Sequence, residues 1–124
     1  MSPRRPGAEA AGFVSSGNTF IGNSADGSTG HGFLWSYGDN NVLTENTATR
    51  NHDEGFLLAG ANANELARNT ANGNNNGFIG WDGASYDTFT RNLARTNRRL
   101  DARPADTCVG NTWPDNHFGT TGGI

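Results

Sequence analysis

The sequence predicts an all-β solenoid, in which short strands and turns repeat as stacked coils. Asparagines recur every 23 residues at four positions, and a fifth follows after 24: Asn23, Asn46, Asn69, Asn92 and Asn116. A large apolar residue lies three positions before each of them: Phe20, Leu43, Leu66, Phe89 and Trp113. Helix formers are scarce between the asparagines, and no apolar pattern is long enough for a stable helix. A period that holds in several registers is typical of one coil per repeat.

The composition is compatible with such a folded chain. The 124 residues include 18 glycines and only 33% hydrophobic residues, which by themselves would also suit a disordered chain. Aromatic residues reach 10%, whereas charged residues are only 17% and the net charge is -3, and these values favour folding. The net charge also argues against nucleic acid as a partner. No apolar run is long enough for a membrane span or for a signal peptide, and a single cysteine, Cys108, excludes a disulfide within the chain.

Each coil is expected to contain three short strands separated by turns. In the central coil these are "GFLLAG" (55–60), "NELARN" (64–69) and a stub around Ala71. The first strand also occurs as "GFLWSY" (32–37) and as "GFIGWD" (77–82). Because a coil this small cannot bury its own apolar residues, neighbouring coils must stack at the strand spacing of about 4.8 Å to form the core.

The asparagines are expected to be structural. Two further polar series keep the period: Asn18, Asn41, Asn64, Asp87 and Asn111 in one, and Ser28, Asn51, Asn74 and Asn97 in the other. Asparagine tolerates the left-handed backbone of a tight turn, and its amide can bond the equivalent residue one coil away. The sequence therefore predicts an asparagine ladder at Asn23, Asn46, Asn69, Asn92 and Asn116. Four other asparagines are expected to be ordinary turn residues: Asn62, Asn72, Asn75 and Asn76.

The motif "GFLLAGANANELARNTANGNNNGF" (55–78) resembles the generic repeats (PbH1) of right-handed parallel β-helix proteins of the pectin-lyase-like superfamily. That group includes CASH-type carbohydrate-binding and sugar-hydrolase modules and NosD-like periplasmic proteins. The ending "DARPADTCVGNTWPDNHFGT" (101–120) resembles their closing segment. The resemblance extends over residues 12–121 and implies a right-handed parallel β-helix of about four and a half coils of 22–24 residues. It is specific for the fold and weak for function, because this fold hosts lyases, hydrolases, epimerases, adhesins and passive scaffolds.

The expected organisation is a flexible N-terminal lead at 1–11, a β-helix at 12–121 with a closing coil at 111–121, and a tail at 122–124. Large aromatics and Pro114 suit a terminal coil that covers the core and discourages further pairing. The N-terminal edge has no such device. Either the chain is the C-terminal part of a longer β-helix, or the lead covers the edge poorly, or two chains meet there. We favour the first, because solenoids need caps; self-association or contact with the parent chain through this edge is the corresponding partner prediction.

No catalytic or metal-binding motif is complete. "TGHGF", around His31, contains the Gly-His-Gly of polygalacturonases, but the other motifs of these enzymes are missing, so His31 is expected to be structural. "HDE" (52–54) is expected to be a solvated turn, because no matching ligand recurs one coil away. Asp82, Asp101 and Arg103 imitate a pectate-lyase calcium site but lack a third carboxylate. We therefore expect no catalytic residue, no metal and no cofactor.

The candidate ligand-binding residues lie at outward positions of the first strand of each coil. One outward row is expected to hold Leu34, Leu57, Ile79 and Asp101, and the next to hold Ser36, Ala59, Trp81 and Arg103. An exposed tryptophan flanked by charged groups suits a sugar ring, which offers an apolar face and hydroxyl groups. The tentative binding residues are Trp81, Asp82, Asp101 and Arg103. The alternative is that a loop or a missing domain covers this apolar strip.

The leading functional hypothesis is a non-catalytic, carbohydrate-contacting or scaffolding β-helix segment that forms the C-terminal part of a larger extracellular protein. The alternative is a polysaccharide lyase, epimerase or glycoside hydrolase of the pectin-lyase-like superfamily. A polysaccharide is thus the expected partner, and neither nucleic acid nor a membrane span is expected. The resemblance implies a secreted or cell-surface location, although no signal peptide is recognisable in the sequence.

Overall fold

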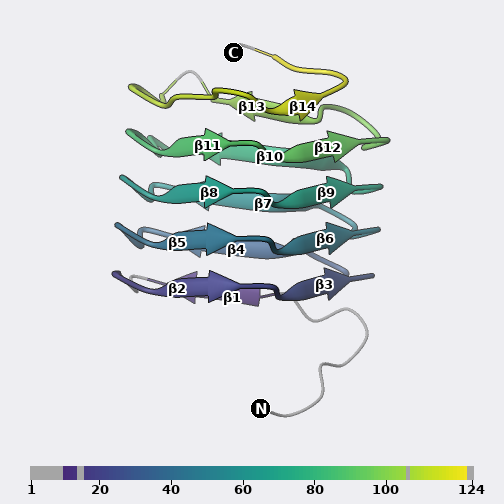
Figure 1. Ribbon diagram of the computed structural model, residues 1–124, viewed down its shortest axis with the longest axis horizontal. Coiled ribbons are helices and arrows are strands. Elements are labelled where there is room, and N and C mark those ends of the chain that lie inside the picture. The colour runs from purple at the N-terminus through teal and green to yellow at the C-terminus, as the bar shows by residue number, and fades with distance from the viewer. Residues whose placement is uncertain (1–9, 14–15, 106, 123–124) are drawn as a thin grey trace.

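The chain winds through three parallel β-sheets that form the sides of a right-handed β-helix (Figure 1). The computed structural model describes residues 10–13, 16–105 and 107–122. The strands are β1 (Ala10–Phe13), β2 (Thr19–Ile21), β3 (Ser24–Asp26), β4 (Phe33–Ser36), β5 (Val42–Thr44), β6 (Thr47–Thr49), β7 (Glu54–Ala59), β8 (Glu65–Ala67), β9 (Thr70–Asn72), β10 (Asn76–Trp81), β11 (Thr88–Thr90), β12 (Leu93–Arg95), β13 (Ala102–Pro104) and β14 (His117–Phe118).

Strands of successive coils lie side by side in each sheet. The first sheet has the order β1-β4-β7-β10-β13, the second β11-β8-β5-β2 and the third β14-β12-β9-β6-β3. All the strand pairs of the described residues are parallel. In Figure 1 the chain passes along the second and third sheets in front and returns along the first sheet behind, rising from the N-terminus to the C-terminus. This arrangement confirms the predicted all-β, right-handed parallel β-helix, and its handedness is the one that parallel strand connections adopt.

The core consists of equivalent residues stacked along the axis of the solenoid. Phe33, Phe56 and Phe78 occupy one register, and their rings stack face to face with centroids 4.8 Å apart at each step. The second sheet contributes Leu43, Leu66 and Phe89, and the third contributes Ala25, Ala48, Ala71 and Ala94, all of them buried. The third sheet comes so close to the first that a Cβ at Gly55 would lie 2.9 Å from the Cβ of Ala71. This close approach explains why a glycine precedes each phenylalanine of the first sheet.

Buried asparagines connect the coils through hydrogen bonds at the corners of the solenoid. Asn69 is typical: its backbone N–H and its Nδ2 both donate to Oδ1 of Asn92, at 2.8 and 3.1 Å. Its own Oδ1 accepts the equivalent bonds from Asn46, at 2.9 and 3.1 Å, and its Nδ2 also donates to the carbonyl oxygen of Leu43. The two other polar series repeat this pattern, as in the bonds of Asn41 to Asn64 and of Asn51 to Asn74. Each internal asparagine therefore uses both its amide group and its carbonyl group within the protein.

The left-handed backbone lies one residue earlier than the sequence predicts. The asparagines do not adopt positive φ at these corners; the residue before each of them does, as for Glu45 (φ 57°) before Asn46 and Arg68 (φ 55°) before Asn69. The asparagine must turn its N–H and amide inward to reach the next coil, whereas the preceding residue points outward and is exposed. The expectation that asparagine supplies the left-handed turn is therefore wrong at these corners.

The C-terminal end of the core is covered by aromatic residues. Trp113 stacks on Phe89 with ring centroids 3.9 Å apart, and Phe118 lies edge-on to Trp113. At the other end, β1, β2 and β3 are the outermost described strands of their sheets. β1 begins at Ala10, inside the segment expected to be a flexible lead; residues 1–9 lie outside the described residues. No helix long and apolar enough to cross a membrane occurs in the part of the chain that the structure describes.

Candidate functional site

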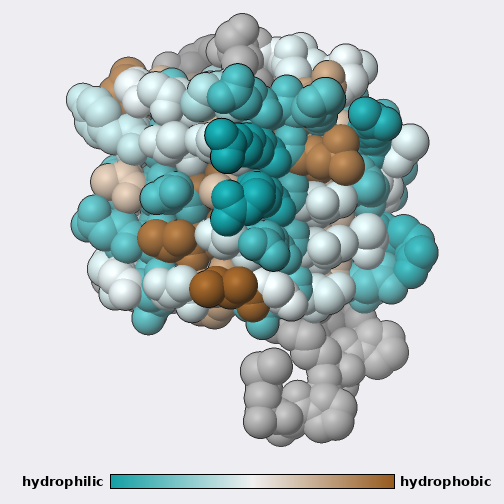
Figure 2. Space-filling model, viewed as in Figure 1, coloured by the Kyte–Doolittle hydropathy of each residue, from teal (hydrophilic) through white to brown (hydrophobic). Residues whose placement is uncertain are grey.

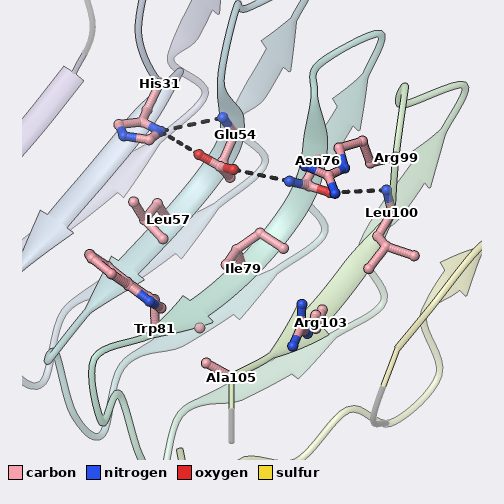
Figure 3. A pocket seen from close by; sticks show the side chains of 11 residues that line it. His31, Glu54, Leu57, Asn76, Ile79, Trp81, Arg99, Leu100, Arg103 and Ala105 are labelled. Carbon is pink, nitrogen blue, oxygen red and sulfur yellow. Dashed lines mark hydrogen bonds and ion pairs between the residues drawn. The ribbon is translucent and has the colours of Figure 1, made fainter. Parts of the chain in front are cut away.

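The candidate site is a groove of about 470 Å³ on the outer face of the first sheet, lined by residues of β7, β10 and β13 and of the turns beside them (Figure 3). The opposite side of the molecule, formed by the second and third sheets, shows a mainly hydrophilic surface with scattered hydrophobic residues (Figure 2). A volume of this size falls within the range of about 300–1,000 Å³ that is typical of small-molecule sites.

The floor of the groove is apolar. Leu57 and Ile79 face each other in the pairing of β7 with β10, and both are half-buried. They point outward because successive side chains of a strand alternate between faces, and their neighbours Phe56 and Phe78 fill the core. This pair matches the outward row predicted from the sequence.

Trp81 forms one end of the groove. It is the last residue of β10 and is 58% exposed, although it is one of the largest apolar side chains in the protein. The chain turns at Asp82, which has a φ of 52°, and the Asp82 carboxylate accepts a hydrogen bond from the Tyr37 hydroxyl. This bond raises the pKa of Tyr37 and directs Asp82 toward the turn. Asp82 is not among the residues that line the groove.

A row of hydrogen-bonded polar groups borders the floor. The Glu54 carboxylate lies 2.9 Å from Nδ1 of His31 and accepts a hydrogen bond of 3.0 Å from Nδ2 of Asn76. The Asn76 side-chain oxygen in turn accepts from the backbone N–H of Leu100. The His31 bond is the main cause that lowers the pKa of Glu54; burial opposes this shift and the Asn76 amide adds to it. Glu54 is therefore an oriented, ionised acceptor at neutral pH.

Two arginines supply positive charge beside β13. Arg103 pairs with Ile79 in the register of β10 and β13, and Arg99 lies on the turn before β13. Both are exposed, and neither forms an ion pair with a carboxylate of the described residues. Gly122 lies against the stem of Arg103, since a Cβ added there would be 3.7 Å from its Cγ and Cδ.

Asp101 differs from its predicted position. The sequence pattern places it outward beside Ile79, but Arg103 takes that place and Ala102 pairs with Phe78. Asp101 is only 3% exposed, and its oxygens accept hydrogen bonds from the backbone N–H groups of Gly119 and Thr120. The last coil is one residue longer than the preceding ones, which shifts the register before β13. Asp101 therefore holds the C-terminal segment and does not face the groove.

The histidines also divide differently from the sequence prediction. His31, predicted to be structural, lines the groove, and so does Glu54, predicted to belong to a solvated turn. His52 and Asp53 do form an exposed pair on that turn. Asn76, predicted to be an ordinary turn residue, lies in β10 and reaches Glu54. A signal for this row was present, because each member lies two residues before a core residue of the first sheet and therefore points outward.

Comparison with known proteins gives one family. A family model described as "Periplasmic copper-binding protein (NosD)" matches residues 11–122. None of the curated proteins and none of the solved structures matches the chain.

Proposed function

The chain belongs to the NosD family, and from this premise we propose that it is a non-catalytic β-helix protein that acts outside the cytoplasm and contacts polysaccharide through the groove. The observation that carries the proposal is Trp81, a tryptophan that is 58% exposed at the end of an apolar floor. Exposed tryptophans beside polar groups suit sugar rings, because a ring offers C–H groups for stacking and hydroxyls for hydrogen bonds.

The groove offers the complementary groups in one place. Leu57 and Ile79 extend the apolar surface next to Trp81, while Glu54, Asn76 and Arg103 border it with acceptors and donors. Stacking plus a few solvated hydrogen bonds supports an affinity of only about 0.1–1 mM per site. Binding is therefore expected on polymers, which make several contacts at once, before it is seen on monosaccharides.

Replacing Trp81 with alanine is expected to abolish polymer binding and to leave the melting temperature nearly unchanged, because the side chain contributes little to the core. The measurement is a glycan array followed by titration of tryptophan fluorescence with the polymers that bind. Tyr86→Ala is the matched control, since Tyr86 is 67% exposed but lies outside the groove. Equal loss in both variants would contradict the assignment of Trp81, and formation of reducing ends or unsaturated products would contradict the non-catalytic function.

Copper, which the family description names, is not part of this proposal. Copper sites in proteins use imidazole, thiolate or thioether ligands. Within residues 10–13, 16–105 and 107–122, no group of three or more His, Cys, Asp or Glu side chains is placed to hold a metal ion. His31 pairs with Glu54, and His52 pairs with Asp53 on an exposed turn. The described side chains thus do not fit a copper site.

We also propose that the N-terminal edge takes part in association, either between copies or with further coils of a parent chain. In the described structure β2 ends this side of its sheet, and Ile21 on β2 is 63% exposed. Sedimentation is expected to show concentration-dependent association, because unpaired strand edges attract further strands. Ile21→Lys should reduce it, since a lysine on an edge strand opposes pairing. A strictly monomeric protein at high concentration would contradict this proposal.

A further inference from the structure

The groove is electrically asymmetric. At one end the charge of Glu54 is accompanied by His31 and held by Asn76. At the other end, along β13, the guanidinium groups of Arg99 and Arg103 line the same groove, and no described carboxylate pairs with either. Figure 3 shows the two arginines on the side of the apolar floor that is far from His31.

The surroundings keep Arg103 at this end of the groove. β13 places it in register with Ile79 of the floor, and Gly122 lies against its stem. Gly122 belongs to the C-terminal segment that Asp101 holds through Gly119 and Thr120. Asp101 is thus a positioning residue, which orders the segment that supports Arg103.

An arginine without an internal partner beside an apolar surface suits an external anion. The guanidinium group is planar, stays charged and binds carboxylate or sulfate oxygens with two parallel hydrogen bonds. A neutral sugar would leave both cations without a counter-charge. An acidic sugar can place its ring on the apolar floor, its acid group at the arginines and its hydroxyls at the Glu54 carboxylate.

We propose that the ligand of the groove is an anionic glycan, whose acid group is bound by Arg99 and Arg103 while a neighbouring ring stacks on Trp81. This inference rests on the proposed function, because it names the class of polysaccharide that the same groove binds. It also gives the ligand a direction, with the acid group at β13 and hydroxyl donors toward Glu54.

The test uses polymers that share a backbone and differ in charge. Hydroxyethyl cellulose, carboxymethyl cellulose and cellulose sulfate are compared, together with dextran, carboxymethyl dextran and dextran sulfate. The wild-type protein is expected to bind an acidic form about tenfold more tightly than the neutral form of the same backbone. Preference for the carboxymethyl polymers would identify a carboxylate ligand, and preference for the sulfated polymers a sulfate ligand.

Three variants locate the effect. Arg99→Ala and Arg103→Ala are each expected to weaken binding of the acidic polymer about five- to tenfold and to leave binding of the neutral polymer unchanged. Arg103→Lys should lose part of this affinity, because it keeps the charge but not the planar fork. Arg95→Ala is the matched control, since Arg95 is an exposed arginine outside the groove, and its effect should stay within about twofold.

The outcomes separate the two proposals. Binding that depends on Trp81 but is equal for neutral and acidic polymers would overturn the anionic ligand and leave the glycan function intact. An effect of Arg95→Ala as large as that of Arg103→Ala would also overturn it, because the attraction would then come from the surface as a whole. Binding to none of the polymers of either backbone, or of the glycan array, would overturn both.

Discussion

Replacing Asn69 with alanine is expected to lower the free energy of unfolding by about 1–3 kcal/mol, because the substitution leaves buried polar groups of three coils without partners. The backbone N–H and Nδ2 of Asn46 lose their acceptor, and the Asn92 side-chain oxygen loses its two donors. The carbonyl oxygen of Leu43 loses a donor as well. Asn46, Asn69 and Asn92 have no exposed surface, so water cannot replace these bonds without opening the coil.

Asn75→Ala is the matched control for this prediction. Asn75 is only partly buried and lies on a turn of the same solenoid, and its side chain makes no hydrogen bond within the described residues. Its replacement should change the free energy of unfolding by about 0.5 kcal/mol or less. Chemical denaturation of the two variants and the wild type gives the comparison. Equal midpoints for Asn69→Ala and Asn75→Ala would show that the bonds between coils contribute no stability.

The fold was predictable because a solenoid converts sequence period into spatial contact. Residues 23 positions apart become neighbours in a sheet, so a regular spacing in the sequence directly gives the strand pairs. Phe56 pairs with Phe33, and Leu66 pairs with Leu43, as the period requires. The same reasoning placed Leu57 and Ile79 on one outward row, which is the floor of the groove.

The site was less predictable because it lies where the period changes. One added residue before β13 moved Asp101 from the outer face to the interior and brought Arg103 beside Ile79. A shift of one residue reverses inside and outside in a strand, so a regular repeat cannot give the orientation there. Glu54 and Asn76 were missed for another reason: their importance comes from hydrogen bonds across coils, which residue types alone do not reveal.

Asp87 is a further exception to the repeat, and it leads to the second large prediction. It occupies an asparagine position: its Oδ1 accepts from the backbone N–H and the Nδ2 of Asn64, as an asparagine oxygen would. Its Oδ2, however, takes the place of an Nδ2 donor and is buried without a hydrogen-bond partner in the described part of the chain. Burial raises the pKa of Asp87 to about 6; the bonds from Asn64 oppose this rise, and the charge of Asp39 adds to it.

The direction of the pH effect follows from this raised pKa. Below the ordinary value of 3.8 the carboxyl group is protonated in the folded and in the unfolded chain, so it does not change stability with pH. Between 3.8 and about 6 the unfolded chain releases the proton more readily, so stability falls as pH rises. Above about 6 the folded protein contains a buried carboxylate, and the accumulated loss is about 3 kcal/mol at most.

Asp87→Asn is therefore expected to raise the free energy of unfolding by about 1–3 kcal/mol at pH 8, with a clearly smaller gain at pH 4. An asparagine at this position can donate through Nδ2 to Asn111, whose side-chain oxygen already accepts the backbone N–H of residue 87. Denaturation of wild type and variant across this pH range isolates Asp87, since all other titrating groups are common to both. A gain that is the same at pH 4 and pH 8 would show that shape, and not the buried charge, distinguishes the two residues.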